Sequence, residues 1–152
     1  MENKIEKIKI KILDDEIYLK AIEILEIENF KSNYFNVKTL LELFEDERAK
    51  IIIAQSQEKI VGYIIIYDNE DSLDIMKIAV KEKYKRENVG TMLLGFLKDK
   101  FNKNIFLEVR ESNQRAIDFY IKNSFDKISI RKKYYKDNNE NAIIMLYKKE
   151  NN

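Results

Sequence analysis

Three consecutive segments in the middle of the chain have the apolar pattern of β-strands and follow one another closely. Lys50–Ser56 and Lys59–Tyr67 are separated only by the polar turn Gln57-Glu58, and Ser72–Val80 follows after a second short gap. Runs of this kind, bounded by polar residues, are typical of strands joined as hairpins. The chain is therefore expected to build a sheet around an antiparallel meander, against which the other elements pack.

The rest of the chain alternates between helix-like and strand-like patterns. Asp14 and Asp15 offer an N-cap for a helix in which Tyr18, Ile22 and Leu25 recur at helical spacing. The other expected elements are a strand over Ile8–Ile12, helices over Val37–Phe44, Thr91–Phe101 and Ser112–Asn123, and strands over Asn104–Val109, Ile128–Tyr135 and Ala142–Tyr147. The order β-α-α-β-β-β-α-β-α-β-β predicts an α+β (mixed α/β) fold, with a central mixed, mostly antiparallel sheet flanked by helices.

Two missing residue types limit the chemistry that this chain can perform. A chain of 152 residues has the size of one ordinary domain, and with no proline and only three glycines its composition marks no linker. We therefore expect a single domain over residues 1–152. The chain has no cysteine and no histidine, which removes thiolate nucleophiles and the commonest general base and metal ligand. We expect no metal, and chemistry carried by carboxylates, tyrosine, lysine, hydroxyls or backbone groups.

The charge balance and the apolar runs bear on partners and location. Lysine and arginine total 28 against 27 acidic residues, a formal net charge of +1. A nucleic-acid-binding domain usually carries a basic excess, so no nucleic-acid partner is expected. The longest apolar run, Ile60–Tyr67, is too short to cross a bilayer, and residues 1–13 lack the apolar stretch of a signal peptide. We expect a cytoplasmic protein without a membrane partner, either a monomer or a homodimer.

The first candidate site is the junction between the strand Ser72–Val80 and the helix that follows it. A helix N-terminus presents unpaired N–H groups and a partial positive charge, which suit a pyrophosphate. Gly90 at the entry permits close approach of the backbone to a ligand. The basic residues of the junction are Lys81, Lys83, Lys85 and Arg86. On spacing alone, a solvated loop before an ordinary helix is favoured roughly 3 to 1, because the Rossmann and P-loop patterns are both missing.

The second candidate site lies around a carboxylate in the strand Asn104–Val109. This strand looks buried on both faces, and a buried Glu108 would be costly unless it is paired or functional. A salt bridge from Glu108 to Arg110 or a nearby lysine is as well supported as catalysis. For Tyr120, on the apolar stripe of the next helix, the simpler interpretation is a core residue whose hydroxyl reaches a partner. For Asn113 the simpler interpretation is helix capping.

Three stretches together resemble the GNAT superfamily of N-acetyltransferases, and within it the ribosomal-protein alanine N-acetyltransferase (RimI-like) family. They are Ile78-Ala79-Val80 with Tyr84-Lys85-Arg86-Glu87-Asn88-Val89-Gly90; Leu107-Glu108-Val109-Arg110 with Ser112-Asn113, Ala116-Ile117 and Phe119-Tyr120; and Arg131 with Tyr134-Tyr135 before Ala142-Ile143-Ile144-Met145. The resemblance is densest over Leu73–Leu146, and the middle stretch is specific to the subfamily. The occurrence of all three in the right order outweighs the simpler interpretations.

The resemblance implies an enzyme that transfers an acetyl group from acetyl-CoA to an amine by direct attack. It implies Glu108 as the general base that deprotonates the amine and Tyr120 as the general acid that protonates the departing thiolate. The implied cofactor-binding residues are Ile78, Ala79 and Val80 along the pantetheine, Lys85, Arg86, Glu87, Asn88, Val89, Gly90 and Thr91 around the pyrophosphate, and Asn113. Arg131, Tyr134 and Tyr135 would bind the acceptor, which the family gives as the N-terminal α-amine of a protein. A carboxylate base and a phenolic acid suit a chain without histidine.

The chain departs from the family pattern at several positions. The family's loop usually reads Gln/Arg-x-x-Gly-x-Gly/Ala, whereas this chain has Lys85 at the first position and Asn88 at the first glycine. Asparagine tolerates left-handed backbone, so we expect the turn to be retained. Ser124 stands where the family has a glycine before Phe125, so the helix Ser112–Asn123 must end without it, and the Pro-Trp pair near the acceptor site is missing.

Three other functions remain open at this point. Within the enzyme class, the acceptor could be a small polyamine or another free amine. A non-catalytic acyl-CoA-binding domain would keep the loop without needing both Glu108 and Tyr120, which are present. A ribosome- or RNA-binding module would account for Arg131, Lys132 and Lys133, but the balanced charge argues against it.

Overall fold

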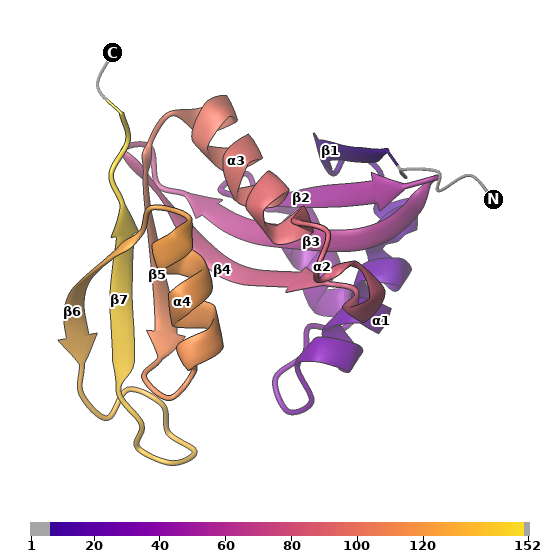
Figure 1. Cartoon of the computed structure of the whole chain (residues 1–152). Helices are drawn as coiled ribbons and strands as arrows, with labels where there is room; N and C mark the ends of the chain where they lie inside the picture. The colour runs from indigo at the N-terminus through magenta and orange to yellow at the C-terminus, as the bar shows by residue number, and fades with distance from the viewer. Residues whose placement is uncertain (1–6, 151–152) are drawn as a thin grey trace.

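The computed structural model describes residues 7–150, which form one seven-stranded sheet with helices on both faces (Figure 1). Residues 1–6 and 151–152, part of the expected domain over 1–152, lie outside the described residues. The elements in chain order are β1 (Ile8–Ile12), the 3-10 helix η1 (Glu16–Tyr18), α1 (Leu19–Asn29), α2 (Val37–Glu45), β2 (Ala49–Ser56), β3 (Lys59–Asp68), β4 (Ser72–Val80), the 3-10 helix η2 (Glu82–Tyr84), α3 (Val89–Phe101), β5 (Asn104–Arg110), α4 (Gln114–Lys122), β6 (Asp126–Arg131) and β7 (Ala142–Tyr147).

The sheet is mixed and mostly antiparallel, as the sequence predicted. Its strand order is β1-β2-β3-β4-β5-β7-β6, and β4 and β5 are the parallel pair. They are parallel because α3 crosses over between them and returns the chain to the same end of the sheet. The turn between β2 and β3 places Gln57 and Glu58 at φ 50° and 68°, the left-handed backbone that a tight two-residue hairpin requires.

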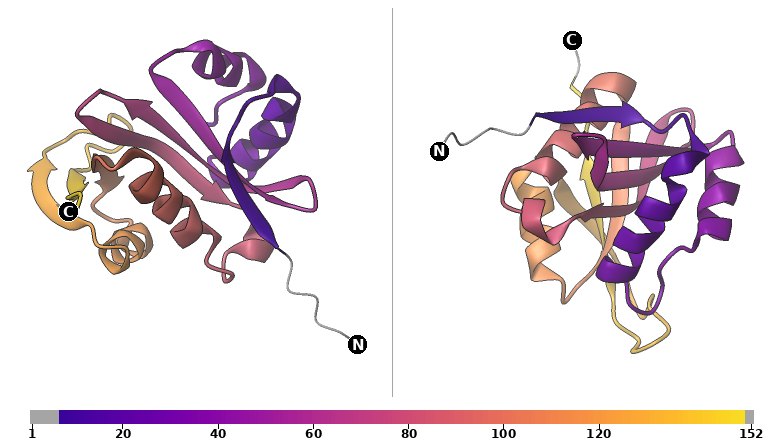
Figure 2. Two further views of the ribbon diagram at one scale, coloured as in Figure 1. Left: turned by 90° about the horizontal axis from the view of Figure 1, so that it is seen from above. Right: turned by 90° about the vertical axis from the view of Figure 1, so that its right-hand side faces the viewer.

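The helices cover the two faces of the sheet in pairs. α1 and α2 lie on one face and α3 and α4 on the other (Figure 2). Alternate residues of β3 therefore enter different cores: Ile64 packs with Leu93 of α3, and Ile65 packs with Ile22 of α1. Because both faces of β3 are covered, its sequence is almost continuously apolar.

Within residues 7–150, one face of β5, β7 and β6 has no helix over it, because α1 and α2 pack against β2, β3 and β4. The expectation that β5 is buried on both faces is therefore wrong. Ile105, Leu107 and Val109 are buried towards α3 and α4, whereas Glu108 points the other way and is exposed. Among residues 7–150, no helix is long and apolar enough to span a membrane.

The expected strand Ile128–Tyr135 is wrong in its bounds, because β6 covers Asp126–Arg131. β6 ends at Arg131, and Lys133 adopts φ 51°, which an extended strand cannot accommodate. Tyr134 and Tyr135 therefore lie in the β6–β7 loop (residues 132–141). α4 ends without a glycine, because Ser124 itself takes the left-handed conformation at φ 73°.

Candidate active site

β4 and β5 pair along their first halves and then diverge (Figure 1). Their register joins Ser72–Ile75 to Asn104–Leu107; beyond it, in the described part of the chain, β4 continues along β3 and β5 along β7. The β3–β4 register skips Met76, a bulge that bends β4 at this point. The edge of β4 that faces β5 is consequently open after Ile75, and an open edge can pair with an added extended chain.

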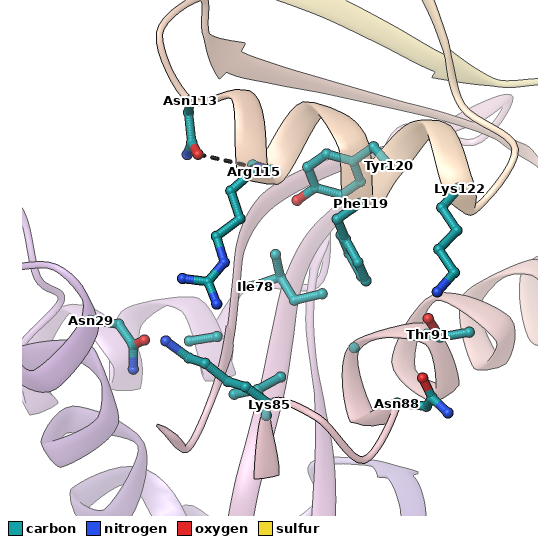
Figure 3. A pocket seen from close by; sticks show the side chains of 14 residues that line it. Asn29, Ile78, Lys85, Asn88, Thr91, Asn113, Arg115, Phe119, Tyr120 and Lys122 are labelled. Atoms are coloured by element: carbon teal, nitrogen blue, oxygen red, sulfur yellow. Dashed lines mark hydrogen bonds between the residues drawn. The ribbon is translucent and has the colours of Figure 1, made fainter. Parts of the chain in front are cut away.

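A pocket of about 390 Å³ lies beside this open edge on the face of α3 and α4, and we call it the helix-side pocket (Figure 3). Eight residues expected at the cofactor line it together with Tyr120: Ile78, Ala79, Val80, Lys85, Asn88, Gly90, Thr91 and Asn113. Three others expected there do not line it. Arg86 and Glu87 are exposed outside its lining, and Val89 is fully buried in the core.

The pocket has further lining residues that the sequence reasoning missed. Arg115, Phe119 and Lys122 occur at positions i, i+4 and i+7 of α4, so they share one face of that helix. Their helical spacing was a signal that could have found them. Figure 3 shows Arg115 and Lys122 pointing into the pocket from above. Asn29, at the end of α1, also lines the pocket, and nothing in its local sequence indicates this.

The N-terminus of α3 opens onto the same pocket. Asn88 precedes it at φ 60° and ψ 22°, and the Asn88 side chain makes no capping hydrogen bond to the helix. The left-handed turn expected at Asn88 is confirmed. The first N–H groups of a helix have no intrahelical partner and carry partial positive charge. With Lys85, Arg115 and Lys122 around it, this turn is suited to hold phosphate groups.

Asn88 provides a prediction about this turn. Glycine adopts the left-handed backbone without the steric cost that asparagine pays. Asn88→Gly is therefore expected to fold and to bind CoA at least as tightly as the wild type. Isothermal titration calorimetry with CoA measures this, and Asn88→Val, a β-branched residue that disfavours positive φ, is the matched variant expected to bind more weakly. Weaker binding by Asn88→Gly would contradict the expectation.

Tyr120 joins the helix-side pocket to the core. Its ring is buried and makes edge-on contacts with Phe119 and Phe125, at centroid distances of 5.2 and 5.4 Å. Figure 3 shows the hydroxyl directed into the pocket. Burial raises the pKa of the Tyr120 hydroxyl above its usual value. The hydroxyl is therefore protonated at neutral pH and can donate a proton or a hydrogen bond.

Glu108 lines a second pocket of about 600 Å³, which we call the sheet-side pocket. Arg131, Tyr134 and Tyr135, expected around the acceptor, line it as well, with Asp74 and Met76 of β4. Among residues 7–150, Glu108 forms its ion pair with Arg131, whose Nη1 lies 3.3 Å from its Oε1, and not with Arg110 or a lysine. A hydrogen bond to the Glu108 carboxylate is the main cause that raises the pKa of Tyr134.

Arg110 holds the β6–β7 loop in place. It forms ion pairs with Asp137 and Glu140 at 3.1 and 3.3 Å and lies 4.0 Å from the ring centroid of Tyr135. Glu140 also accepts a hydrogen bond from the Ser112 N–H at 2.7 Å. Hydrogen bonds from Ser112 lower the pKa of Glu140 to about 2. The loop that carries Tyr134 and Tyr135 is thus tied to the end of β5, beside Glu108.

The structure places Glu108 and Tyr120 in different pockets. Tyr120 lies on the α3–α4 face, and Glu108 points from β5 to the face that no helix covers. The divergence of β4 and β5 separates them, with Ile78 lining one pocket and Met76 the other. Two reactants could therefore approach from opposite sides of the sheet and meet between these strands.

Comparison with known proteins agrees with this geometry. Residues 16–125 match the model of the acetyltransferase (GNAT) family. A Bacillus subtilis (strain 168) protein, named provisionally as a [ribosomal protein bS18]-alanine N-acetyltransferase, is 32% identical over 125 residues, 80% of this chain and 83% of its own length. The crystal structure of the ribosomal-protein-S18-alanine N-acetyltransferase from Escherichia coli superposes with a TM-score of 0.81 at 28% identity, covering 95% of this chain and 97% of that chain.

A further similar protein has been solved with acetyl coenzyme A bound. It is a protein from Bacillus anthracis str. Ames that is provisionally named a streptothricin acetyltransferase, crystallised in complex with acetyl coenzyme A. It is 28% identical, with a TM-score of 0.65, and the match covers 72% of this chain and 68% of that chain. The chain belongs to the acetyltransferase (GNAT) family. It is an N-acetyltransferase of the kind that uses acetyl-CoA, as the sequence predicted.

Proposed function

We propose that Glu108 and Tyr120 carry the acetyl transfer as general base and general acid, and that the acceptor is the N-terminal α-amine of a protein. The observation that supports this proposal most is the divergence of β4 and β5. It leaves an open strand edge with the Tyr120 hydroxyl on one side and the Glu108 carboxylate on the other. A thioester that follows this edge would lie between an acid and a base.

Acetyl-CoA would occupy the helix-side pocket. Its pantetheine arm would pair with the open edge of β4 at Ile78, Ala79 and Val80 as an added strand does. Its pyrophosphate would lie at the N-terminus of α3, where Lys85, Arg115 and Lys122 supply positive charge. These side chains bind and orient the donor, and the Tyr120 hydroxyl lies in the same pocket.

The proposed reaction needs no covalent acyl-enzyme. The acceptor's ammonium group loses a proton to the Glu108 carboxylate, directly or through one water. The free amine nitrogen attacks the thioester carbonyl carbon, a C–N bond forms, and the C–S bond breaks. Tyr120 donates its proton to the departing thiolate, and the second proton that the nitrogen loses as the amide forms restores the Tyr120 phenol, directly or through water. A positioned carboxylate and phenol can each supply a proton-transfer contribution of about 10²-fold or more.

The sheet-side pocket supports an α-amine acceptor. Arg131, Tyr134 and Tyr135 offer hydrogen-bonding groups around Glu108 to an extended peptide. An α-amine has a pKa near ~8, roughly two units below that of a lysine side chain, so a carboxylate deprotonates it more readily. The relatives from Bacillus subtilis and Escherichia coli are named for the same class of acceptor.

A small polyamine is the second candidate acceptor. Asp74 and Glu108 both line the sheet-side pocket, and two carboxylates suit a substrate with several ammonium groups. One solved relative is provisionally named for streptothricin, an acceptor of another class than a protein N-terminus.

A panel of acceptors distinguishes the candidates. Hexapeptides that begin with Ala or Ser, the same peptides with a blocked N-terminus and an internal lysine, and spermidine are offered with acetyl-CoA. We expect thiol release, and acetylation detected by mass spectrometry, with the free N-termini alone. Faster turnover of spermidine, or modification of the blocked peptide's lysine, would contradict the proposed acceptor.

A further inference from the structure

A buried ion pair lies on the α1–α2 face of the sheet and takes no part in the proposed transfer. Lys77 of β4 donates a hydrogen bond to Oε1 of Glu26 in α1 at 2.6 Å, and their side chains are only 9% and 0% exposed. The other carboxylate oxygen of Glu26 accepts a hydrogen bond from the Tyr63 hydroxyl of β3. Burial, followed by this hydrogen bond, raises the pKa of Tyr63. Charges are seldom buried without such compensation.

The same two side chains shape the α1–α2 loop (residues 30–36). Lys77 donates a second hydrogen bond to the Asn33 carbonyl at 2.6 Å, and its ammonium lies 4.3 and 3.8 Å from the ring centroids of Phe30 and Phe35. Glu26 accepts the Phe35 N–H at 2.7 Å. The loop contains no glycine or proline, and its end is held by the Asn36 cap of α2 and by the Val37 N–H bonded to Glu23. The hydrogen bonds to its middle, at Asn33 and Phe35, come from the ion pair.

Lys77, the β4 member of the ion pair, stands between two residues that line different pockets. Met76, before Lys77, lines the sheet-side pocket, and Ile78, after it, lines the helix-side pocket. Asn29, the last residue of α1, also lines the helix-side pocket directly before the loop begins. The α1–α2 loop and the β6–β7 loop project from the same end of the molecule, on either side of the divergence of β4 and β5 (Figures 1 and 2).

We infer that Lys77 and Glu26 are positioning residues that hold the α1–α2 loop as one wall of the acceptor's approach, facing the wall formed by the β6–β7 loop. This inference rests on the proposed function, in which the acceptor enters beside Glu108. Neither side chain contacts substrate, because both are enclosed by the loop and by α1. Acceptor affinity depends on the ion pair, whereas donor affinity, which the N-terminus of α3 and the basic face of α4 mainly set, does not.

The test removes both charges at once. Lys77→Met alone leaves a buried carboxylate unpaired and can prevent folding, so the double variant Glu26→Gln/Lys77→Met, which preserves side-chain size, is used. In the folded double variant we expect the KM of the acceptor to rise about tenfold and the Kd of CoA to change by less than about twofold. In hydrogen exchange, the Phe35 amide is expected to lose protection while the amides of β2 and β3 keep theirs.

A second ion pair of the same length provides the control. Lys103 and Asp68 lie 2.6 Å apart at the far end of β3, and Lys103→Met is expected to change neither constant. The KM is measured with whichever acceptor the wild type turns over. The wild-type rates therefore test the proposed acceptor class, and the double variant tests the ion pair separately. An unchanged acceptor KM in the folded double variant, or an equal loss of CoA affinity, would overturn the inference.

Discussion

Replacement of Glu108 by glutamine is expected to lower kcat about 10²-fold or more while leaving CoA affinity close to that of the wild type. Glutamine preserves the size and hydrogen-bonding oxygen of the side chain but cannot take the proton that the acceptor's ammonium must lose. CoA affinity is retained because Glu108 lies outside the helix-side pocket. Steady-state thiol release at saturating acceptor and calorimetry with CoA measure the two quantities.

Glu111→Gln is the matched control for Glu108. Glu111 is exposed just beyond the end of β5, where its carboxylate accepts a hydrogen bond from the Asn141 side chain. It lines neither of the two pockets, so kcat is expected to stay at the wild-type level. Tyr120→Phe removes the proposed acid and is expected to lower kcat in the same way as Glu108→Gln. If both variants keep wild-type turnover in saturating substrate, the proposed catalytic pair is wrong.

The central strands could be predicted from the sequence because their signals are local. β4 has the expected bounds, and β3 extends one residue further than expected, since the continuous apolar run, the polar turns and the short gaps define them. The N-terminal turn of α3 could also be anticipated, because asparagine is one of the few residues that adopt its backbone conformation.

The exposure of Glu108 could not be predicted, because it depends on which strands the helices cover. Isoleucine, phenylalanine, leucine and valine surround Glu108 in β5, a composition that also fits a strand buried on both faces. The structure leaves one face of β5 open, so the carboxylate is accessible. A pattern along one strand carries no information about where distant helices pack.

The ion pair of Glu26 and Lys77 was missed for a similar reason. Glu26 is one of several acidic residues in α1, and its partner lies 51 residues further along the chain. In the sequence neither residue differs from a solvated surface charge. Only the packing of α1 on β3 and β4 brings them together and buries them.

Gly90→Val is expected to abolish CoA binding, and the structure adds a reason that the sequence did not give. A β-carbon at Gly90 would lie 2.9 Å from Cζ of Phe119, which is closer than real contacts of this kind. Gly90 therefore allows the N-terminus of α3 to approach α4 as well as a ligand. Valine would displace the Phe119 ring and, with it, the face of α4 that carries Arg115 and Lys122. Overpacking of this kind also destabilises proteins, typically by about 1–3 kcal/mol.

Gly95→Ala, in the same helix, is the matched control. A β-carbon at Gly95 meets nothing within 4 Å, so alanine is expected to stabilise the protein by roughly 0.5–1 kcal/mol through its helix propensity. CoA affinity should not change. In thermal unfolding, Tm is expected to fall for Gly90→Val and to rise for Gly95→Ala. In calorimetry with CoA, only Gly90→Val is expected to lose affinity. If Gly90→Ala loses CoA binding and Gly90→Ala/Phe119→Leu regains it, contact with the ring is the cause. Undiminished affinity in Gly90→Val would mean that the phosphates bind away from the N-terminus of α3.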